Sequence, residues 1–327
     1  MAPVYALDHF YLVITLFITT GYQLVGFFIA WTLQFDKITD FTGGSNFFIL
    51  ALVTLLLGNT FHARNIVASV LVMAWAVRIA GFLLYRVLKM GSDTRFDEIR
   101  SHFFKFLGFW IAQILWVWVV SLPVTILNSP AVSDLGRTGS NPPFGTGRDI
   151  AGVILWALGF IIESVADLQK LQFKLSLQNK GKFIKGGLWA WSRHPPYFGE
   201  ILCWWGIWIV SLSPTTNGGL AKSAQVAQNV AVLSPIFTTL ILLFGSGMPT
   251  AEKPQAKRYY QLSQERTEDS SFTIWHEYQE YLHSTSILIP LPPAIYRRLP
   301  KFLKQTLLLD LPFYQFHAER DIERTNA

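Results

Sequence analysis

Seven long apolar segments follow one another along this chain, and they constrain its fold more than any other feature. They lie at residues 10–31, 47–60, 65–88, 106–127, 150–166, 200–213 and 226–245. A helix needs about 20 mostly apolar residues to cross the hydrocarbon core of a bilayer. In lipid, a helix also satisfies its own backbone hydrogen bonds. The sequence therefore predicts an all-α fold, a polytopic membrane helix bundle of about seven transmembrane helices.

Composition and the distribution of apolar residues predict how the chain is organised. Hydrophobic residues make up 51% of it and charged residues 15%, against roughly 25% charged in soluble domains. We predict a single membrane bundle over residues 1–293, followed by a basic interfacial or cytosolic tail over residues 294–327. Residues 295–309 mix cations with Leu and Phe, which suits either a helix in the membrane interface or one packed on the protein's own cytosolic face.

Lysine and arginine in the short loops predict the orientation. Twelve of them fall in one set of alternate loops and four in the other, so the first set is expected in the cytosol. The N-terminus is then lumenal and the C-terminus cytosolic. The long tail and a polar insert at 253–275 favour the endoplasmic reticulum over a bacterial inner membrane.

Charge and cysteine content narrow the possible ligands. The net charge of +6 resides in short loops between apolar segments, which favours contact with membrane lipids rather than with nucleic acid. A single cysteine, Cys203, excludes an internal disulfide. The seven histidines are scattered, so we expect no metal site.

The segment from Gly186 to Glu200 carries the densest chemistry, because it places ionisable and aromatic groups at the border of an apolar segment. Arg193, His194, Tyr197 and Glu200 lie in it, and four lysines precede it, at 174, 180, 182 and 185. Such cations can bind a pyrophosphate or a 2′-phosphate. The alternative is a positively charged loop that only fixes topology.

Three further polar groups lie in or next to the apolar segments. Glu163 and Asp167 are spaced i, i+4, and Lys170 and Lys174 follow on the same helical face. The two acids either accept hydrogen bonds from a ribose or an amide, or form ion pairs with these lysines within the helix. Arg78, inside the third segment, needs a partner such as Asp40 or Glu163, or else contacts a substrate or nicotinamide. Glu252 follows a predicted helix break at Ser246-Gly247 and is expected on the same cytosolic surface as Arg193.

These residues resemble a known family, the DUF1295 branch of the steroid 5-alpha-reductase superfamily, over residues 35–293. The matching marks are Thr39-Asp40-Phe41, Trp75 to Arg78, Asp93 to Phe96, Phe109-Trp110 with Gln113, Asp167 with Gln169-Lys170, Gly181 to Phe183, Gly187 to Pro195, Tyr197 to Glu200, Ser234-Pro235, Ser246 to Pro249 with Glu252, and Tyr278 to Tyr281 with Ile289-Pro290.

The resemblance implies a membrane enzyme that binds NADPH from the cytosol, within residues 150–293. It implies reduction of a C=C bond conjugated to a carbonyl, in a lipid or steroid-like substrate. The cofactor-binding residues carried over to this chain are Glu163, Asp167, Lys174, Arg193, His194, Tyr197, Glu200, Glu252 and Tyr278.

Two positions depart from the family pattern. Pro196 replaces an Asn before Tyr197, which removes a side-chain amide and a backbone donor. Trp75 stands where the steroid reductases have a tyrosine three residues before the arginine, and an indole is no acid near neutral pH. Another group must then donate the proton. Asp40, Tyr85 and Tyr22 are candidates, and Asp40, Arg78 and Tyr85 form the predicted catalytic set.

Two other function classes stay open at this point. A membrane methyltransferase of the isoprenylcysteine type, using S-adenosylmethionine, would share Arg193-His194-Pro195 and Tyr197. It would also need a second acid after Glu252, where this chain has Lys253. A non-catalytic sterol- or lipid-binding membrane protein is the third possibility, and it is kept open by Pro196 and Trp75.

Overall fold

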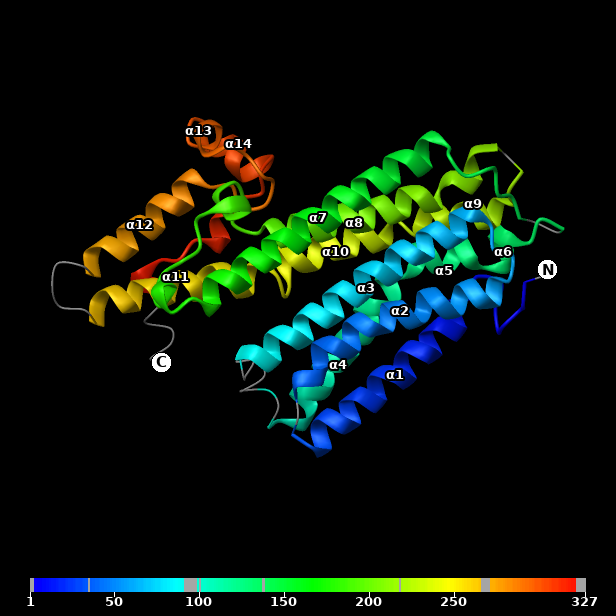
Figure 1. The fold of residues 1–327 in the computed structure, drawn as a ribbon, viewed down its shortest axis with the longest axis horizontal. Coiled ribbons are helices and arrows are strands. Elements are labelled where there is room, and N and C mark those ends of the chain that lie inside the picture. Colours follow the sequence, from blue (N-terminus) through cyan, green and yellow to red (C-terminus); the bar gives the residue numbers. More distant parts are fainter. Residues whose placement is uncertain are drawn as a thin grey trace. The chain divides into compact units, whose positions relative to one another are not determined.

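A computed structural model describes residues 3–34, 36–90, 99, 101–136, 139–217, 219–265 and 271–321. Two predicted features fall partly or wholly outside these residues: the family mark from Asp93 to Phe96, and the middle of the polar insert at 253–275. Over the described ranges the chain is helical and has no strand; pairing of β type is limited to two isolated bridges, one of which joins Ser192 to Ser286. The predicted all-α membrane bundle is confirmed (Figure 1).

The chain divides into two compact units. Unit 1 holds residues 1–157 and 202–238, and unit 2 holds residues 158–201 and 239–327. The helices α1 to α6 and α9 belong to unit 1, and α11 to α14 to unit 2; the residues of α7, α8 and α10 are divided between them. The sequence predicted one bundle over residues 1–293 and a separate tail over 294–327, so the two compact units divide the chain at different residues.

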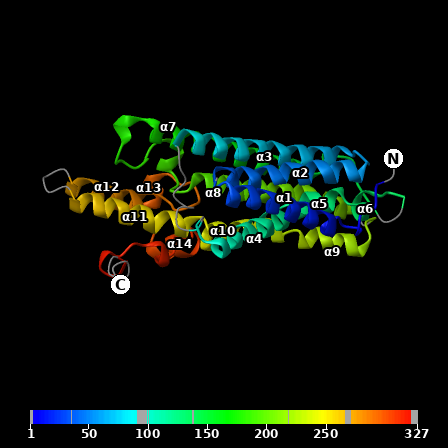
Figure 2. The same ribbon diagram turned by 90° about the horizontal axis from the view of Figure 1, so that it is seen from below.

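The helices of unit 1 are mostly long and apolar. They are α1 (Leu12–Thr32), α2 (Thr39–Gly58), α3 (Ala63–Met90), α4 (Phe103–Val120), α5 (Leu122–Asn128), α6 (Pro130–Ser133) and α9 (Lys222–Val230), with the starts of α7 (Gly147–Leu175) and α10 (Leu233–Phe244) and the end of α8 (Pro195–Ser211). Helix α2 lies in the middle, in contact with α1, α3, α4 and α5. Figures 1 and 2 both show α1, α2 and α3 side by side.

Helix α2 begins eight residues earlier than the apolar segment 47–60 predicted, because its first turns are polar yet buried. The Gln23 amide of α1 donates to the Asn46 Oδ1 at 3.0 Å, and the Gln113 amide of α4 donates to the Gln23 Oε1 at 2.8 Å and to the Thr39 carbonyl at 3.1 Å. Polar side chains that bond one another between helices are tolerated inside a membrane bundle. The polar turns of α2 are therefore stable where the sequence shows no apolar segment.

Six helical segments among the described residues are long and apolar enough to cross a membrane. The predicted segment 200–213 corresponds to α8, which has 17 residues and is not among these six. The predicted segment 106–127 is divided into α4 and α5, since Pro123 in the first turn of α5 cannot donate the backbone hydrogen bond that would continue α4. The segment 226–245 is likewise divided, between α9 and α10.

Unit 2 is built from shorter, more polar elements. The helices α11 (Met248–Glu265) and α12 (Ser271–Ser284) lie side by side in both views (Figures 1 and 2). The one-turn segments are the 3-10 helices η4 (Gly187–Ala190) and η6 (Pro312–Tyr314), together with α13 (Pro293–Tyr296) and α14 (Lys301–Thr306). A single helix over 295–309 was the wrong expectation, because Pro300 caps the start of α14 and separates it from α13.

Candidate functional site

Arg193 lies at the centre of a buried charged network in unit 2. Its Nη1 is 3.2 Å from the Glu252 Oε2, and its Nη2 is 2.7 Å from the Asp310 Oδ1. The other oxygen of Glu252 is 2.7 Å from the His194 Nε2, and the Tyr296 hydroxyl donates to the other oxygen of Asp310. The Arg193 side chain is only 6% exposed, so these contacts are formed away from water and are strong.

The backbone around Arg193 is held in place by the segment that follows α12. The Arg193 amide donates to the Ser286 carbonyl at 2.8 Å, and the Ser192 hydroxyl donates to the Leu288 carbonyl at 2.8 Å. The Ser192 hydroxyl also accepts the His194 amide at 3.1 Å. Two segments nearly a hundred residues apart in sequence thereby fix the direction in which Arg193 enters the network.

The first turn of α8 packs closely on α7 within the same unit. A Cβ on Gly199 would lie 2.6 Å from the Gly159 carbonyl oxygen and 2.7 Å from the Glu163 nitrogen, so only glycine fits there. Glu163, which is 2% exposed, is thus brought against the motif Tyr197 to Glu200. The ring of Tyr197 stacks on that of His194 at 5.1 Å, which fixes the imidazole plane.

The surroundings of the network shift the protonation of two of its members. Burial lowers the pKa of the His194 imidazole below its ordinary value, and the neighbouring Glu252 opposes this shift only in part. Burial and the adjacent Asp310 raise the pKa of the Tyr296 phenol, so it stays protonated and donates. His194 is therefore neutral near pH 7 and Arg193 is the cation of the network.

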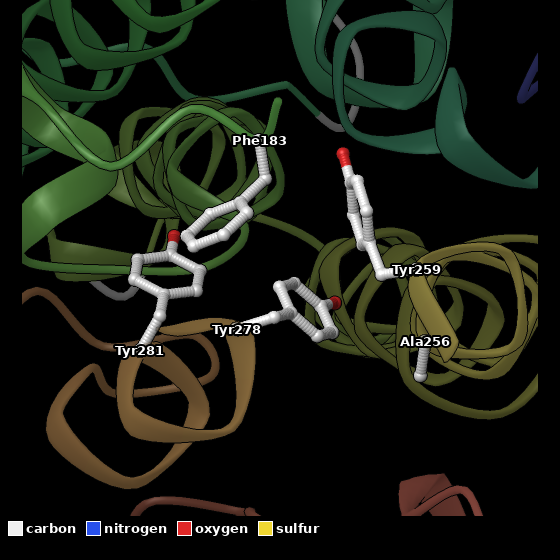
Figure 3. Packing of buried hydrophobic residues seen from close by; sticks show 5 residues of the cluster. All are labelled: Phe183, Ala256, Tyr259, Tyr278 and Tyr281. Carbon is white, nitrogen blue, oxygen red and sulfur yellow. The ribbon is translucent and has the colours of Figure 1, made fainter. Parts of the chain in front are cut away.

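An aromatic cluster lies beside the network. Figure 3 shows Tyr278 and Tyr281 of α12 and Tyr259 of α11 around Phe183. The ring of Phe183 is 5.1 Å from that of Tyr278 and 5.4 Å from that of Tyr281. The Tyr281 hydroxyl donates to the Trp189 carbonyl at 2.8 Å, so the cluster also supports η4.

One face of Phe183 lines a cavity of about 810 Å³ in unit 2. The wall is formed by the end of α7, the loop from Asn179 to Gly187, and α12; its polar members are Gln169, Gln172, Asn179, Lys182, Lys185 and Glu277. Lys185 pairs with Glu277 at 2.8 Å. The volume is within the usual range for ligand pockets, and the wall combines amides, ammonium groups and an aromatic ring.

Gly187, at the rim of this cavity, is conformationally required. Gly187 has φ of 62°, and a Cβ there would lie 2.5 Å from the Gln169 Nε2. In this conformation the Leu188 amide donates to the Gln169 Oε1 at 3.0 Å, and the Trp189 indole donates to the Ala166 carbonyl at 3.0 Å. The segment that begins at the cavity therefore leads directly, through η4, to Arg193.

The predicted cofactor residues all belong to unit 2, and the structure brings several of them into contact. Arg193, His194 and Glu252 form one network, as expected for groups on the same surface. Tyr278 is buried in the aromatic cluster, Tyr197 and Glu200 are half-buried at the start of α8, and Glu163 is buried in α7. On the same helix, Asp167 is half-buried and Lys174 is exposed. A role for any of them in cofactor binding stays a prediction.

The predicted catalytic residues belong to unit 1. Asp40, in the first turn of α2, is 3.5 Å from Arg86 of α3. Arg78 is half-buried in α3, and Tyr85 of the same helix is 48% exposed, with the Lys89 ammonium 5.8 Å from its ring centre. Their part in a reaction is likewise still a prediction.

Sequence reasoning missed two members of the network, Asp310 and Tyr296, because both lie in the segment predicted as a tail. A signal was available: Asp310 is the only acid between residues 281 and 318, in a stretch whose four lysines and arginines are interspersed with apolar residues. A lone acid in a basic segment indicates an internal partner. The lining residues Lys182 and Lys185 belong to the basic loop that the sequence offered for phosphate binding, but they were not among the cofactor-binding residues carried over from the family.

No group of three or more His, Cys, Asp or Glu side chains within the described ranges is arranged to hold a metal ion. Cys203 is buried, forms no disulfide among these residues, and its thiol donates to the Trp156 carbonyl at 3.5 Å.

Comparisons with known proteins agree with the membrane fold and leave the reaction open. A protein of Ustilaginoidea virens named "Probable O-methyltransferase ustE" is 33% identical over 92 residues, which is 28% of each of the two chains. No solved structure matches. The family described as "Protein of unknown function (DUF1295)" matches residues 26–268. Since that match covers most of the chain, the protein belongs to the DUF1295 family, a steroid 5-alpha-reductase-like family of membrane proteins.

Proposed function

We propose that the protein is a membrane oxidoreductase that uses NADPH to reduce a conjugated C=C bond in a lipid or steroid-like substrate. The observation that carries the proposal is the cavity beside Phe183, with two lysines and the Gly186–Gly187 backbone on its wall. Its location on unit 2 agrees with the cytosolic side expected from the loop charges. We further propose the endoplasmic reticulum, with a lumenal N-terminus and a cytosolic C-terminus.

The residues of this cavity fit a dinucleotide phosphate. Lys182 and Lys185 supply positive charge for phosphate groups, and Gln169, Gln172 and Asn179 offer amide donors and acceptors for ribose and base. Phe183 presents an aromatic ring to the same space. The Arg193 Nε, which is buried without a hydrogen-bond partner, is a further donor in the neighbouring network.

The bound cofactor would supply a hydride to the β-carbon of an enone. The residues of the chain would do the rest. Lys182 and Lys185 would bind and orient the phosphates, and the apolar helices would admit an apolar substrate from the bilayer and exclude water. Glu200 and Tyr197, half-buried at the start of α8, would position the nicotinamide end. The carbonyl of the substrate would be polarised by a hydrogen bond from the Tyr85 hydroxyl, or from Asp40 in its protonated form, and a proton from such a donor would complete the reduction at the α-carbon.

A methyltransferase using S-adenosylmethionine is the second candidate, and the similarity to the protein named a probable O-methyltransferase favours it. S-adenosylmethionine carries a sulfonium, an ammonium and one carboxylate, and it has no phosphate. A wall with two lysines and one acid is therefore better matched to NADPH. A methyltransferase would also need a second acid directly after Glu252, and this chain has Lys253 at that position.

Thermal stabilisation of the purified full-length protein in detergent separates the candidates. At a ligand concentration about 100 times its Kd, binding stabilises by about 2.7 kcal/mol, or about 5–10 °C at 2–4 °C per kcal/mol. We expect this shift with NADPH, a smaller one with NADH because of the missing 2′-phosphate, and none with S-adenosylmethionine. A shift with S-adenosylmethionine alone would replace the proposal by the second candidate, and no shift with any of them would favour the lipid binder.

Variants locate the binding site. The pair Lys182→Gln and Lys185→Gln should weaken NADPH binding by about tenfold for each lysine, since a charged hydrogen bond contributes about 1.5–3 kcal/mol. Lys222→Gln, an exposed lysine of unit 1, is the matched control. Glu200→Gln should also reduce the affinity of a reductase for NADPH, whereas a lipid binder would keep its ligand.

A further inference from the structure

The segment from Ile295 to Phe313, which we call the strap, has an inner side fixed to the Arg193 network. Tyr296 lies near the start of the strap and Asp310 near its end, and the Tyr296 hydroxyl donates to the Asp310 carboxylate. Asp310 is in turn 2.7 Å from the Arg193 Nη2. The Lys304 ammonium lies 4.3 Å from the centre of the Tyr296 ring. The strap is therefore a closed loop whose two ends meet at Arg193.

The far end of the strap is tied to an apolar helix at the border of the membrane. The Tyr314 hydroxyl donates to the Leu243 carbonyl at 2.7 Å, and the Phe313 ring stacks on Phe244 at 6.0 Å. Leu243 and Phe244 are the last residues of α10, beyond which the chain becomes polar in α11. An element bonded to that helix end lies at the level of the lipid headgroups.

The outer side of the strap is both apolar and cationic. Ile295, Phe302 and Leu307 are 52%, 71% and 67% exposed. Arg298 and Lys301 are exposed between them. The single acid of the segment, Asp310, is used on the inner side. Large apolar side chains among cations, at the edge of a membrane, match the interface of an anionic bilayer.

We propose that the strap is a membrane-surface site for anionic lipid headgroups, and that its binding to the bilayer holds Asp310 on Arg193. Phe302 and Leu307 enter the acyl boundary, while Arg298 and Lys301 bind the headgroup phosphates and carboxylates. The coupling is mechanical, since the four residues assigned to lipid lie between Tyr296 and Asp310, which are bonded to each other and, through Asp310, to Arg193. The proposal does not depend on NADPH.

Fluorescence of full-length protein in lipid nanodiscs tests the location of the strap. In a Cys203→Ser background, Phe302→Cys carries an environment-sensitive label, and Gln279→Cys, an exposed position on α12, is the matched control. With phosphatidylserine added to phosphatidylcholine, the label at 302 should shift to the blue and be quenched by nitroxide lipids, and the label at 279 should do neither. A label at 302 that behaves like the one at 279 in both lipids overturns the proposal, and a partner protein would then be the better occupant.

Charge reversal tests the lipid class. Arg298→Glu with Lys301→Glu should shift the strap toward the unbound state by about fivefold for each cation, and high salt should act in the same direction. Arg258→Glu with Arg320→Glu makes the same change in charge outside the strap and should leave quenching unchanged. Equal quenching in pure phosphatidylcholine and in phosphatidylserine would overturn the assignment to anionic headgroups.

The coupling to Arg193 has its own readout, which involves no nucleotide. The wild-type protein should melt at a higher temperature in nanodiscs with phosphatidylserine than in those without, and Asp310→Asn should abolish that difference while leaving the quenching of the label at 302. A lipid-dependent melting temperature that survives Asp310→Asn contradicts the coupling. A single cooperative melting transition of every variant in detergent confirms that each one is folded. Asp310→Asn is expected to melt at a lower temperature there, because the buried Arg193 loses one of its two carboxylates.

Discussion

Replacement of Glu252 by glutamine is the sharpest test of the buried network. The side chain is 7% exposed and lies between Arg193, at 3.2 Å, and His194, at 2.7 Å. Glutamine keeps the shape and removes the charge, which leaves Arg193 buried with Asp310 as its remaining carboxylate. Breaking a buried ion pair by removing one partner destabilises by about 3–5 kcal/mol. Because Asp310 stays, we expect the lower end, about 3 kcal/mol.

At about 2–4 °C per kcal/mol, the apparent melting temperature of Glu252→Gln should fall by about 6–12 °C. The assay is tryptophan fluorescence of the full-length protein in one detergent at a fixed heating rate. Glu280→Gln is the control. Glu280 forms an ion pair with Arg297 at 3.1 Å, and the two side chains are 60% and 57% exposed. Such surface pairs contribute about 0–1 kcal/mol. If the two variants melt within 2 °C of each other (about 1 kcal/mol), Arg193 is not held by a strong buried pair and the reasoning is refuted.

Three further predictions concern the same two units. Burial holds the pKa of His194 below its ordinary value of 6.5, so the folded state binds fewer protons than the unfolded state. The free energy of unfolding should therefore fall as the pH drops below about 6.5. Melting curves of wild type and His194→Gln at pH 7.5 and 5.5 check this, and an equal drop in the melting temperature of both proteins would reject it. Gly199→Ala should destabilise through the contact with Glu163, whereas Gly81→Ala, which has open space around it, should be neutral or stabilising by up to about 1 kcal/mol; melting temperatures in the reverse order would contradict the close packing of α7 and α8. Asp149→Asn should destabilise unit 1 by about 3 kcal/mol, because Asp149 receives two hydrogen bonds from the buried Arg64 at 2.7 and 2.8 Å; a melting temperature equal to wild type would show that this pair is dispensable.

Much of the fold was predictable because membrane crossing leaves a direct signal in the sequence. All seven apolar segments are helical, two of them divided between two helices, since lipid accepts only chains that satisfy their own backbone hydrogen bonds. The helix break after Phe244 was also predictable, and α11 begins at Met248 as the Ser-Gly and Met-Pro pairs indicated. The early start of α2 was not predictable, because Asn46 and Thr39 are stabilised by partners on α1 and α4 that no local pattern shows.

The candidate site shows the same division. The motif from Arg193 to Glu200 could be singled out because ionisable groups at a membrane border need a reason to be there. The partners of Arg193 could be inferred only in part. Glu252 was expected on the same surface, but Asp310 lies 117 residues away, in a tail that was predicted either in the membrane interface or on the protein's own cytosolic face, with no partner named.

The sequence by itself determined that this is a multi-pass helical membrane protein with a cationic, aromatic motif at one border, because hydrophobicity and charge act locally along the chain. Only the tertiary structure decided that the motif is a buried network closed by Glu252, Tyr296 and Asp310. The physical reason is that an ion pair depends on the distance between two side chains, and the fold sets that distance irrespective of their separation in sequence. For the same reason, only the structure showed that the strap has one side fixed to Arg193 and another side with exposed apolar residues.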